Sequence, residues 1–124
     1  MPLVEVRLFR TQGGKCPAKI WLDELERRDP RAYAVCLALI QELEVNGHEM
    51  ERPASGFLRD GIYELRATSR NVQHRILYFF NGRGVAVLSH GLTKERRVPP
   101  DDIALAIHRK GLVRVNPGQY TTDW

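Results

Sequence analysis

The chain has 124 residues, of which 43% are hydrophobic and 27% are charged, so it fits one domain with a modest core and not a disordered segment. The net charge is +4 and unevenly placed, since residues 59–114 hold 11 of the 19 Lys/Arg but only 5 of the 15 Asp/Glu. No apolar run is long enough to span a bilayer, the first residues do not resemble a secretion signal, and the two cysteines lack zinc spacing. We therefore expect a cytoplasmic protein with no membrane anchor, metal or cofactor, whose basic half is the place for a polyanion.

The first part of the chain predicts a strand and a helical hairpin. Apolar and polar residues alternate over residues 3–10, which is the period of a strand. Pro17 then opens a helix, because proline is tolerated in a first helical turn. Asp29-Pro30 interrupts this helix, and a second helix follows until Asn46-Gly47, a typical helix end.

The second part predicts a three-stranded meander and a third helix. The strand signals cover residues 61–68, 72–80 and 84–92. A loop is expected over 48–56, and Asn81-Gly82-Arg83-Gly84 predicts a hairpin turn. The third helix is expected to begin at Pro99-Pro100 and to end at Gly111, and residues 112–124 show no clear period.

These elements predict the α+β class, in the order β-α-α-β-β-β-α. We expect a twisted antiparallel sheet packed against the N-terminal helical hairpin and a C-terminal helix, with the helices mainly on one face. The chain would form one domain over residues 1–124, with a core of about 3–110 and a tail over 112–124.

Two motifs in this order resemble the RelE/ParE toxin superfamily, in its HigB-like, phage-derived branch. The first is Gly61-Ile62-Tyr63-Glu64-Leu65-Arg66, followed by His74-Arg75-Ile76-Leu77-Tyr78. The second is His90-Gly91-Leu92-Thr93-Lys94-Glu95-Arg96-Arg97-Val98-Pro99, which runs into a helix. The resemblance covers most of the chain and implies a compact RelE-like fold.

The resemblance implies the toxin of a type II toxin-antitoxin system, a ribosome-dependent endoribonuclease that cleaves messenger RNA in the ribosomal A site. Its implied partners are the ribosome with its messenger, a cognate antitoxin with a helix-turn-helix domain, and promoter DNA through the antitoxin complex alone. A non-enzymatic, ParE-like inhibitor of DNA gyrase on the same scaffold, or an inactive relative, is the alternative. A plain nucleic-acid-binding module is a third interpretation, which the lack of a helix-turn-helix or stacking-aromatic signature disfavours.

Metal-independent RNA cleavage uses the ribose 2′-OH as nucleophile. It needs a base for that proton, an acid for the leaving 5′-oxygen, and cations for the charge on the phosphate. Arg66, at the end of the first meander strand, matches the family's strand arginine and suits bidentate binding of a phosphate. The alternative for Arg66 is a surface arginine in a cross-strand ion pair.

A second basic cluster lies between the last strand and the third helix, where the family carries catalytic residues. Lys94 is the candidate acid or charge stabiliser, Arg96 is the second catalytic candidate and Arg97 a contact for RNA. The spacing does not decide which of the two arginines faces the site, and a solvated basic turn is the alternative for the whole cluster.

Three further side chains are candidates on the strands. His90 can shuttle a proton because imidazole titrates near neutral pH, unless it is a hydrogen-bonded structural histidine. Arg75 is a candidate RNA contact on the middle strand, and its neighbour His74, which must point to the opposite face, is held in reserve. Arg70, in the turn between the first two meander strands, is a further candidate contact for RNA.

The aromatic residues leave the general base open, because no tyrosine follows Arg97 where related ribonucleases carry one. Tyr120 and Trp124 could fold back to stack on a base. Tyr63 and Tyr78 are expected in or near the core, and Trp21 is expected to pack a helix against the sheet.

Overall fold

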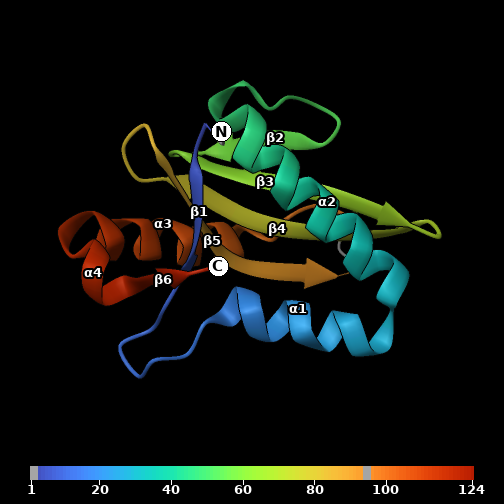
Figure 1. Ribbon diagram of the computed structural model, residues 1–124, viewed down its shortest axis with the longest axis horizontal. Helices are drawn as coiled ribbons and strands as arrows, with labels where there is room; N and C mark the ends of the chain where they lie inside the picture. The colour runs from blue at the N-terminus through green and yellow to red at the C-terminus, as the bar shows by residue number, and fades with distance from the viewer. Residues whose placement is uncertain (1–2, 94–95) are drawn as a thin grey trace.

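A six-stranded sheet forms the centre of the protein, in the order β2-β3-β4-β5-β1-β6 (Figure 1). The computed structural model describes residues 3–93 and 96–124, so Lys94 lies outside the described residues. The strands are β1 (Glu5–Phe9), β2 (Ser55–Arg59), β3 (Ile62–Ser69), β4 (Val72–Phe80), β5 (Val85–Thr93) and β6 (Thr121–Asp123). The helices are α1 (Pro17–Arg28), α2 (Pro30–Asn46), α3 (Pro100–Val115) and α4 (Pro117–Tyr120), with a 3-10 turn at Gly47–Glu49.

The α+β class is confirmed, and local chemistry explains the helical hairpin. Each of α1 and α2 begins at a proline, whose missing N–H is one that a helix start leaves unpaired. Asp29 ends α1 and caps α2, because its Oδ1 accepts the backbone N–H of Ala32 at 3.1 Å. The hairpin therefore turns within a single residue.

The expectation that the helices lie mainly on one face was wrong, because both faces of the sheet are covered. The helices α1 and α2 pack on one face, which is the one turned toward the viewer in Figure 1, and α3 packs on the other. The reason lies in β4, where six consecutive residues from His74 to Phe79 are buried. Alternate residues of such a strand point to opposite faces, so both faces need a cover.

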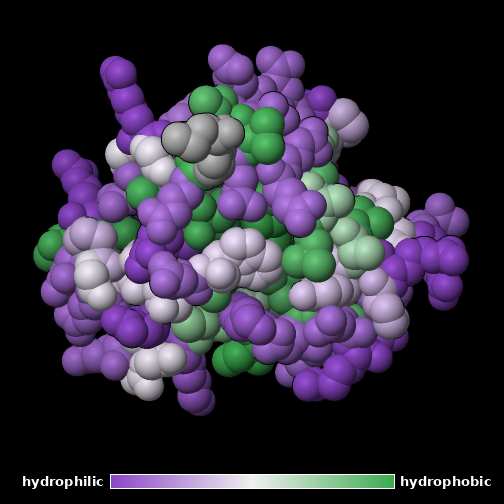
Figure 2. All heavy atoms as spheres, viewed as in Figure 1, coloured by the Kyte–Doolittle hydropathy of each residue, from purple (hydrophilic) through white to green (hydrophobic). Residues whose placement is uncertain are grey.

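The hydrophobic core accordingly has two layers. The layer under α1 and α2 contains Leu22, Leu25, Cys36, Ile40, Ile76, Tyr78 and Leu88. The layer under α3 contains Leu77, Phe79, Val87, Ala106 and Val113. On the outward side of the hairpin, hydrophilic side chains surround the hydrophobic residues near the centre of the face (Figure 2).

Three local expectations were also wrong, and the tail, for which no element was predicted, is structured. The sheet is not purely antiparallel, because β1 pairs with β5 in parallel. The expected loop over 48–56 runs into β2, and the tail forms α4 and β6. The helix α3 continues through Gly111 to Val115, because the residue that stops it is Asn116, which precedes Pro117 and is forced out of helical geometry.

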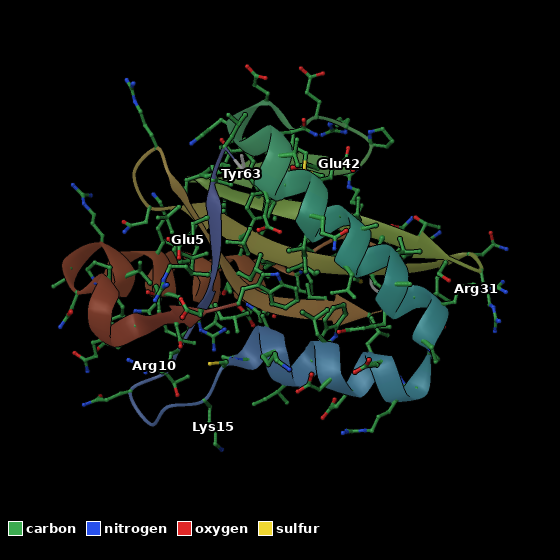
Figure 3. All side chains as sticks on the ribbon, in the orientation of Figure 1. Glu5, Arg10, Lys15, Arg31, Glu42 and Tyr63 are labelled. Atoms are coloured by element: carbon green, nitrogen blue, oxygen red, sulfur yellow. The ribbon has the colours of Figure 1, made fainter. Side chains whose placement is uncertain are left out.

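The tail is fixed to the sheet by pairing and by side chains. Thr121 to Asp123 pair with β1 in antiparallel register. Arg10, at the end of β1, donates from Nη2 to the carbonyl oxygens of Gly118 and Gln119, each at 3.1 Å (Figure 3). The last residues of the chain are therefore part of the sheet that the first strand joins.

A close approach between Trp21 of α1 and Gly91 of β5 joins the hairpin to the sheet. A Cβ atom at position 91 would lie 2.1 Å from the indole ring, so only glycine lets the ring rest on the strand. The expectation that Trp21 packs between helix and sheet is confirmed. Across residues 3–93 and 96–124, no helix has the length and apolar character needed to cross a membrane.

Candidate functional site

An open pocket of about 480 Å³ lies on the α3 side of the sheet, between β2, β3 and the segment that leads into α3. We call it the arginine pocket. Its lining consists of Arg52, Phe57, Leu58, Glu64, Arg66, Arg75, Arg96, Arg97, Val98 and Ile103. Five guanidinium groups and one carboxylate thus share a single concave surface, which favours an anionic ligand.

Glu64 contacts two of the arginines in this pocket, and its side chain is only 1% exposed. Its Oε1 accepts a hydrogen bond from Nη1 of Arg75 at 2.9 Å and lies 3.2 Å from Nε of Arg66. The two arginines face each other across the β3–β4 pair. A carboxylate between two guanidinium groups offsets part of their repulsion and fixes their directions.

Arg75 is held on both sides and has little freedom. Besides its bond to Glu64, it donates from Nη2 to the backbone carbonyl of Arg96 at 2.7 Å. It therefore ties the segment before α3 to the sheet and places Arg96 and Arg97, both exposed, at the edge of the pocket. The geometry assigns Arg75 a positioning function, while its contact with RNA stays a prediction.

Arg66 is more accessible than Arg75, with 29% of its side chain exposed. Its guanidinium lies against the backbone of Gly56 in β2, where a Cβ atom would come within 3.2 Å of Nη2. Its Nε is close enough to Glu64 for an ion pair but is not aligned as a hydrogen bond. No hydrogen bond within the described part of the chain engages its Nη1 and Nη2, so the two nitrogens can together donate hydrogen bonds to an anion.

Two other predicted residues do not join this group. Arg70 occupies the β3–β4 turn, is exposed and has a positive φ of 53°, and it does not line the pocket. Lys94 lies outside the described residues. The roles predicted for both stay predictions.

His90 lies on the α3 face of β5, away from the lining of the arginine pocket. A bulge in the β4–β5 pairing leaves Ser89 unmatched, which places His90 opposite Leu77. Its Nδ1 is 2.8 Å from the Ser89 hydroxyl and its Nε2 is 3.1 Å from Oδ1 of Asp102 in α3. Both ring nitrogens are thus engaged, and the contact of Nε2 with Asp102 joins β5 to α3.

The surroundings of His90 favour the neutral imidazole. Burial lowers its pKa below the ordinary value, and the nearby Arg109 guanidinium lowers it further, against the opposing effect of Asp102. Arg109 donates to the backbone carbonyl of Ser89 at 3.1 Å and lies over the Phe9 ring. In the neutral form Nε2–H donates to Asp102 and the Ser89 hydroxyl donates to Nδ1. The proton shuttle predicted for His90 stays a prediction.

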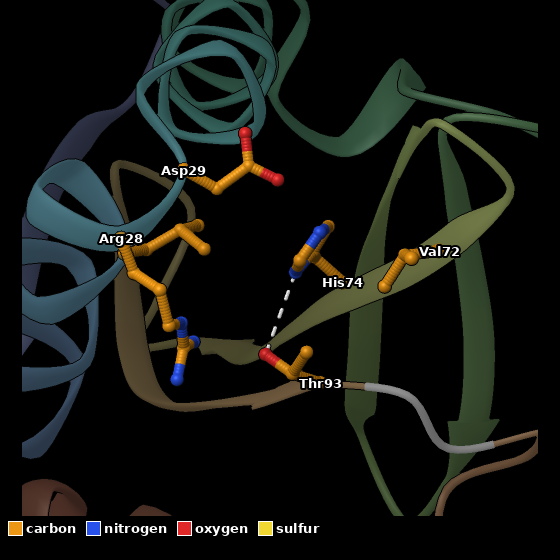
Figure 4. Close-up of a pocket in the computed structure, with 6 residues that line it drawn as sticks. Arg28, Asp29, Val72, His74 and Thr93 are labelled. Atoms are coloured by element: carbon orange, nitrogen blue, oxygen red, sulfur yellow. Dashed lines mark hydrogen bonds between the residues drawn. The ribbon is translucent and has the colours of Figure 1, made fainter.

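His74 and Arg75 point to opposite faces, as expected for neighbours on a strand. Arg75 lines the arginine pocket, whereas His74 is 3% exposed and lines a separate pocket beneath the α1–α2 turn (Figure 4). The side-chain arrangement thus places Arg75, and not His74, beside Arg66.

The aromatic residues lie in the core more than in the pocket. Tyr78 is 1% exposed and its hydroxyl bonds to Ser55 at 2.5 Å, and Tyr63 stacks on it, so their expected burial is confirmed. Tyr120 stacks on Phe9, with ring centroids 6.1 Å apart. Neither Tyr120 nor Trp124 lines the arginine pocket, and their predicted stacking on a base stays untested.

Sequence reasoning missed two charged members of the pocket, Glu64 and Arg52. Glu64 could have been recognised from the sequence, because it is a lone acid between apolar residues of a strand and lies two positions before Arg66. The sequence did not point to Arg52, since it lies in a segment expected to be a loop. Among residues 3–93 and 96–124, no three His, Cys, Asp or Glu side chains are grouped so that they could hold a metal ion.

The sequence of the chain matches a known protein family. The family described as "Phage derived protein Gp49-like (DUF891)" matches residues 21–111, which is 91 of the 124 residues. The chain belongs to this family. The family is related to toxins of the RelE/HigB type, in agreement with the predicted phage-derived branch, and the matched segment contains the whole arginine pocket. A search of curated proteins found no match.

Proposed function

We propose that the protein is the toxin of a type II toxin-antitoxin system and a ribosome-dependent endoribonuclease that cleaves messenger RNA by attack of the 2′-OH on the adjacent phosphate. The observation that carries the proposal is the Arg66 guanidinium, which is directed by Glu64 in a pocket with four further arginines. Its two terminal nitrogens form no hydrogen bond with the residues that the structure describes. Membership of a phage-derived family related to such toxins supports it.

In the proposed reaction Arg66 binds two oxygens of the scissile phosphate. The phosphate gains charge in the transition state, so a fixed, permanently charged guanidinium stabilises that state more than the ground state. Arg96 and Arg97 contribute further positive charge from the edge of the pocket. Glu64 and Arg75 act through Arg66 and the 96–98 segment, which makes them positioning residues.

The proposed reaction also needs residues that transfer protons. No histidine belongs to the lining that the structure describes, so the acid that protonates the leaving 5′-oxygen is proposed to be Lys94. His90 is the second candidate for proton transfer, by way of a movement that would free its Nε2 from Asp102.

The proposed partners follow from the same charge pattern. Ribosomal and messenger RNA would meet the arginine pocket, and binding should weaken with salt because phosphate contacts release counterions. An antitoxin that silences the protein would bring acidic side chains to the same pocket, and promoter DNA would be bound through the antitoxin in that complex.

The test is induced expression of the wild type, of an Arg66→Ala/Lys94→Ala double variant and of Arg31→Ala as a control. Arg31 is an exposed arginine at the start of α2 and does not line the pocket. Growth and the 5′ ends of messages are followed together. Arrest with new cuts in translated messages is expected for the wild type and the control, and not for the double variant.

Two results would contradict the proposal. Growth arrest with intact messages in all three strains would indicate a binder of the gyrase-inhibitor type. Absence of arrest in the wild type would indicate an inactive relative.

A further inference from the structure

A second pocket, of about 440 Å³, lies on the opposite face of the sheet from the arginine pocket. It lies where the α1–α2 turn covers the start of β4 and the end of β5 (Figure 4). Its lining consists of Leu25, Arg28, Asp29, Val72, His74 and Thr93. Since His74 and Arg75 are consecutive on β4, the two pockets are separated by the thickness of one sheet.

The wall of this pocket contains a polar side chain that the described residues do not satisfy. His74 is 3% exposed, and its Nε2 is buried with no hydrogen-bond partner among residues 3–93 and 96–124. Its Nδ1 has one distant neighbour, the Thr93 hydroxyl at 3.4 Å. Burial lowers the pKa of His74, so the ring is neutral near pH 7 and Nε2 can donate or accept according to its tautomer. A buried polar atom of this kind is available to a partner that enters the pocket.

The charged groups of the pocket both come from the α1–α2 turn. The Asp29 carboxylate points toward His74, while the Arg28 side chain extends toward the level of Thr93 (Figure 4). Oδ1 of Asp29 accepts one bond, from the Ala32 N–H. A carboxylate has about four acceptor positions in all, so Asp29 can still receive two donors from a ligand. Leu25 and Val72 supply apolar walls.

We propose that this pocket binds a guanine base. A carboxylate accepts only, and guanine is the base with two adjacent donors on one edge, N1–H and the N2 amino group, which would pair with Asp29. The N7 and O6 acceptors of guanine lie on another edge, where an arginine is the commonest specific partner, and Arg28 fits that role. The flat ring would lie against Leu25 and Val72, and the unpaired Nε2 of His74 would bond to the base or its ribose.

The guanine can come from two sources, a free nucleotide or a single-stranded RNA. For RNA the inference rests on the proposed ribonuclease function, because the phosphates next to the bound base would continue around the end of the sheet into the arginine pocket. A guanine held there would give the enzyme a preferred cutting context.

Calorimetric titration of the purified protein with GMP, IMP and AMP tests the base. IMP lacks the N2 amino group and AMP lacks both donors, so we expect affinity to fall in the order GMP, IMP, AMP, by at least tenfold from GMP to AMP. Asp29→Asn should weaken GMP binding at least tenfold, because the amide replaces an acceptor by a donor. Asparagine caps helices as well as aspartate does, so this variant should keep its fold and its melting temperature.

Two further variants complete the test. Asp23→Asn, on α1 but outside the pocket, is the matched control and should bind GMP like the wild type. His74→Phe keeps an aromatic ring but removes both ring nitrogens, and it should weaken GMP binding. Equal binding of GMP and AMP, no saturable binding of GMP, or full binding by Asp29→Asn would overturn the inference.

Short RNAs that contain one guanosine, or inosine in its place, distinguish the sources. If RNA is the source, the guanosine RNA binds more tightly than GMP and loses affinity in both Asp29→Asn and Arg66→Ala. If a free nucleotide is the source, GMP binds as well as the RNA and Arg66→Ala has no effect. Because these titrations need no ribosome, a failure of base binding is separate from a failure of messenger cleavage.

Discussion

Arg75 donates to Oε1 of Glu64 over 2.9 Å at a place where both residues are almost fully shielded from water, with 8% and 1% exposed. Replacement of Glu64 by glutamine would leave the Arg75 guanidinium buried without its counter-charge. Removal of one partner from a buried ion pair typically costs about 3–5 kcal/mol of unfolding free energy. Urea denaturation should show a loss of that order for Glu64→Gln and almost none for Glu42→Gln, an exposed glutamate on α2. Equal midpoints for the two variants would contradict the assigned role.

Gly56→Ala tests how closely the position of Arg66 controls activity. The new methyl group would lie 3.2 Å from Nη2 of Arg66, so the guanidinium must shift by a few tenths of an ångström. Displacement of a catalytic group by about 1 Å can cost ~100-fold in rate, so a loss of roughly tenfold in messenger cleavage is expected here. The matched control is Gly84→Ala, where nothing lies within 4 Å of the new carbon. Unchanged cleavage by Gly56→Ala would indicate that Arg66 has room to adjust.

Gly91→Ala should destabilise the protein without any contact to the arginine pocket. The added carbon would lie 2.1 Å from the Trp21 ring, so α1 would have to move away from β5. Overpacking of this kind typically costs about 1–3 kcal/mol. Thermal and urea unfolding of Gly91→Ala and Gly84→Ala measure the difference, and Trp21→Leu should restore part of it by making room. If the double variant is no more stable than Gly91→Ala alone, the indole is not the group that is displaced.

Stability should fall as the pH drops below about 6.5, in part because of His90. The folded protein lowers the pKa of His90 below its ordinary 6.5, so the unfolded chain binds a proton more readily than the folded one. Stability is therefore complete above the unfolded pKa and is lost as the pH falls from there toward the lowered folded pKa. His74 has a lowered pKa as well and adds to this slope. Unfolding midpoints between pH 5 and 8 should depend less on pH in His90→Gln and less again when His74→Phe is added, whereas an unchanged slope would contradict this origin.

The sequence predicted those parts of the fold that depend on neighbours along the chain. Pro17 and Asp29-Pro30 set the helical hairpin, and the uninterrupted apolar run of β4 set the middle of the meander. The strands β2 and β6 were missed because each is short. In addition, β6 becomes a strand by pairing with the distant β1, whereas the partner of β2 is β3, which follows it directly. The parallel pairing of β1 with β5 joins residues about eighty positions apart, and no local pattern encodes it.

The candidate site divides in the same way. Arg66 and Arg75 could be predicted to face each other once two adjacent strands were expected, because their side chains follow the period of the strand. The partners of His90 could not, since Asp102 and Arg109 come from α3 and meet the histidine only when that helix covers the second face. The position of His90 near the end of a strand could be predicted from the sequence, but the hydrogen bonds around it depend on tertiary packing.

The position of β1 between β5 and β6 affects how the protein folds during its synthesis. The strand β1 pairs with segments that are synthesised much later than itself, at residues 85–88 on one side and 121–123 on the other. Contacts this far apart in sequence slow folding, because a long loop must close before they form. The sheet is therefore completed only after Thr121–Asp123 have been synthesised, and removal of the residues that follow α3 would leave one side of β1 as an open, unpaired edge.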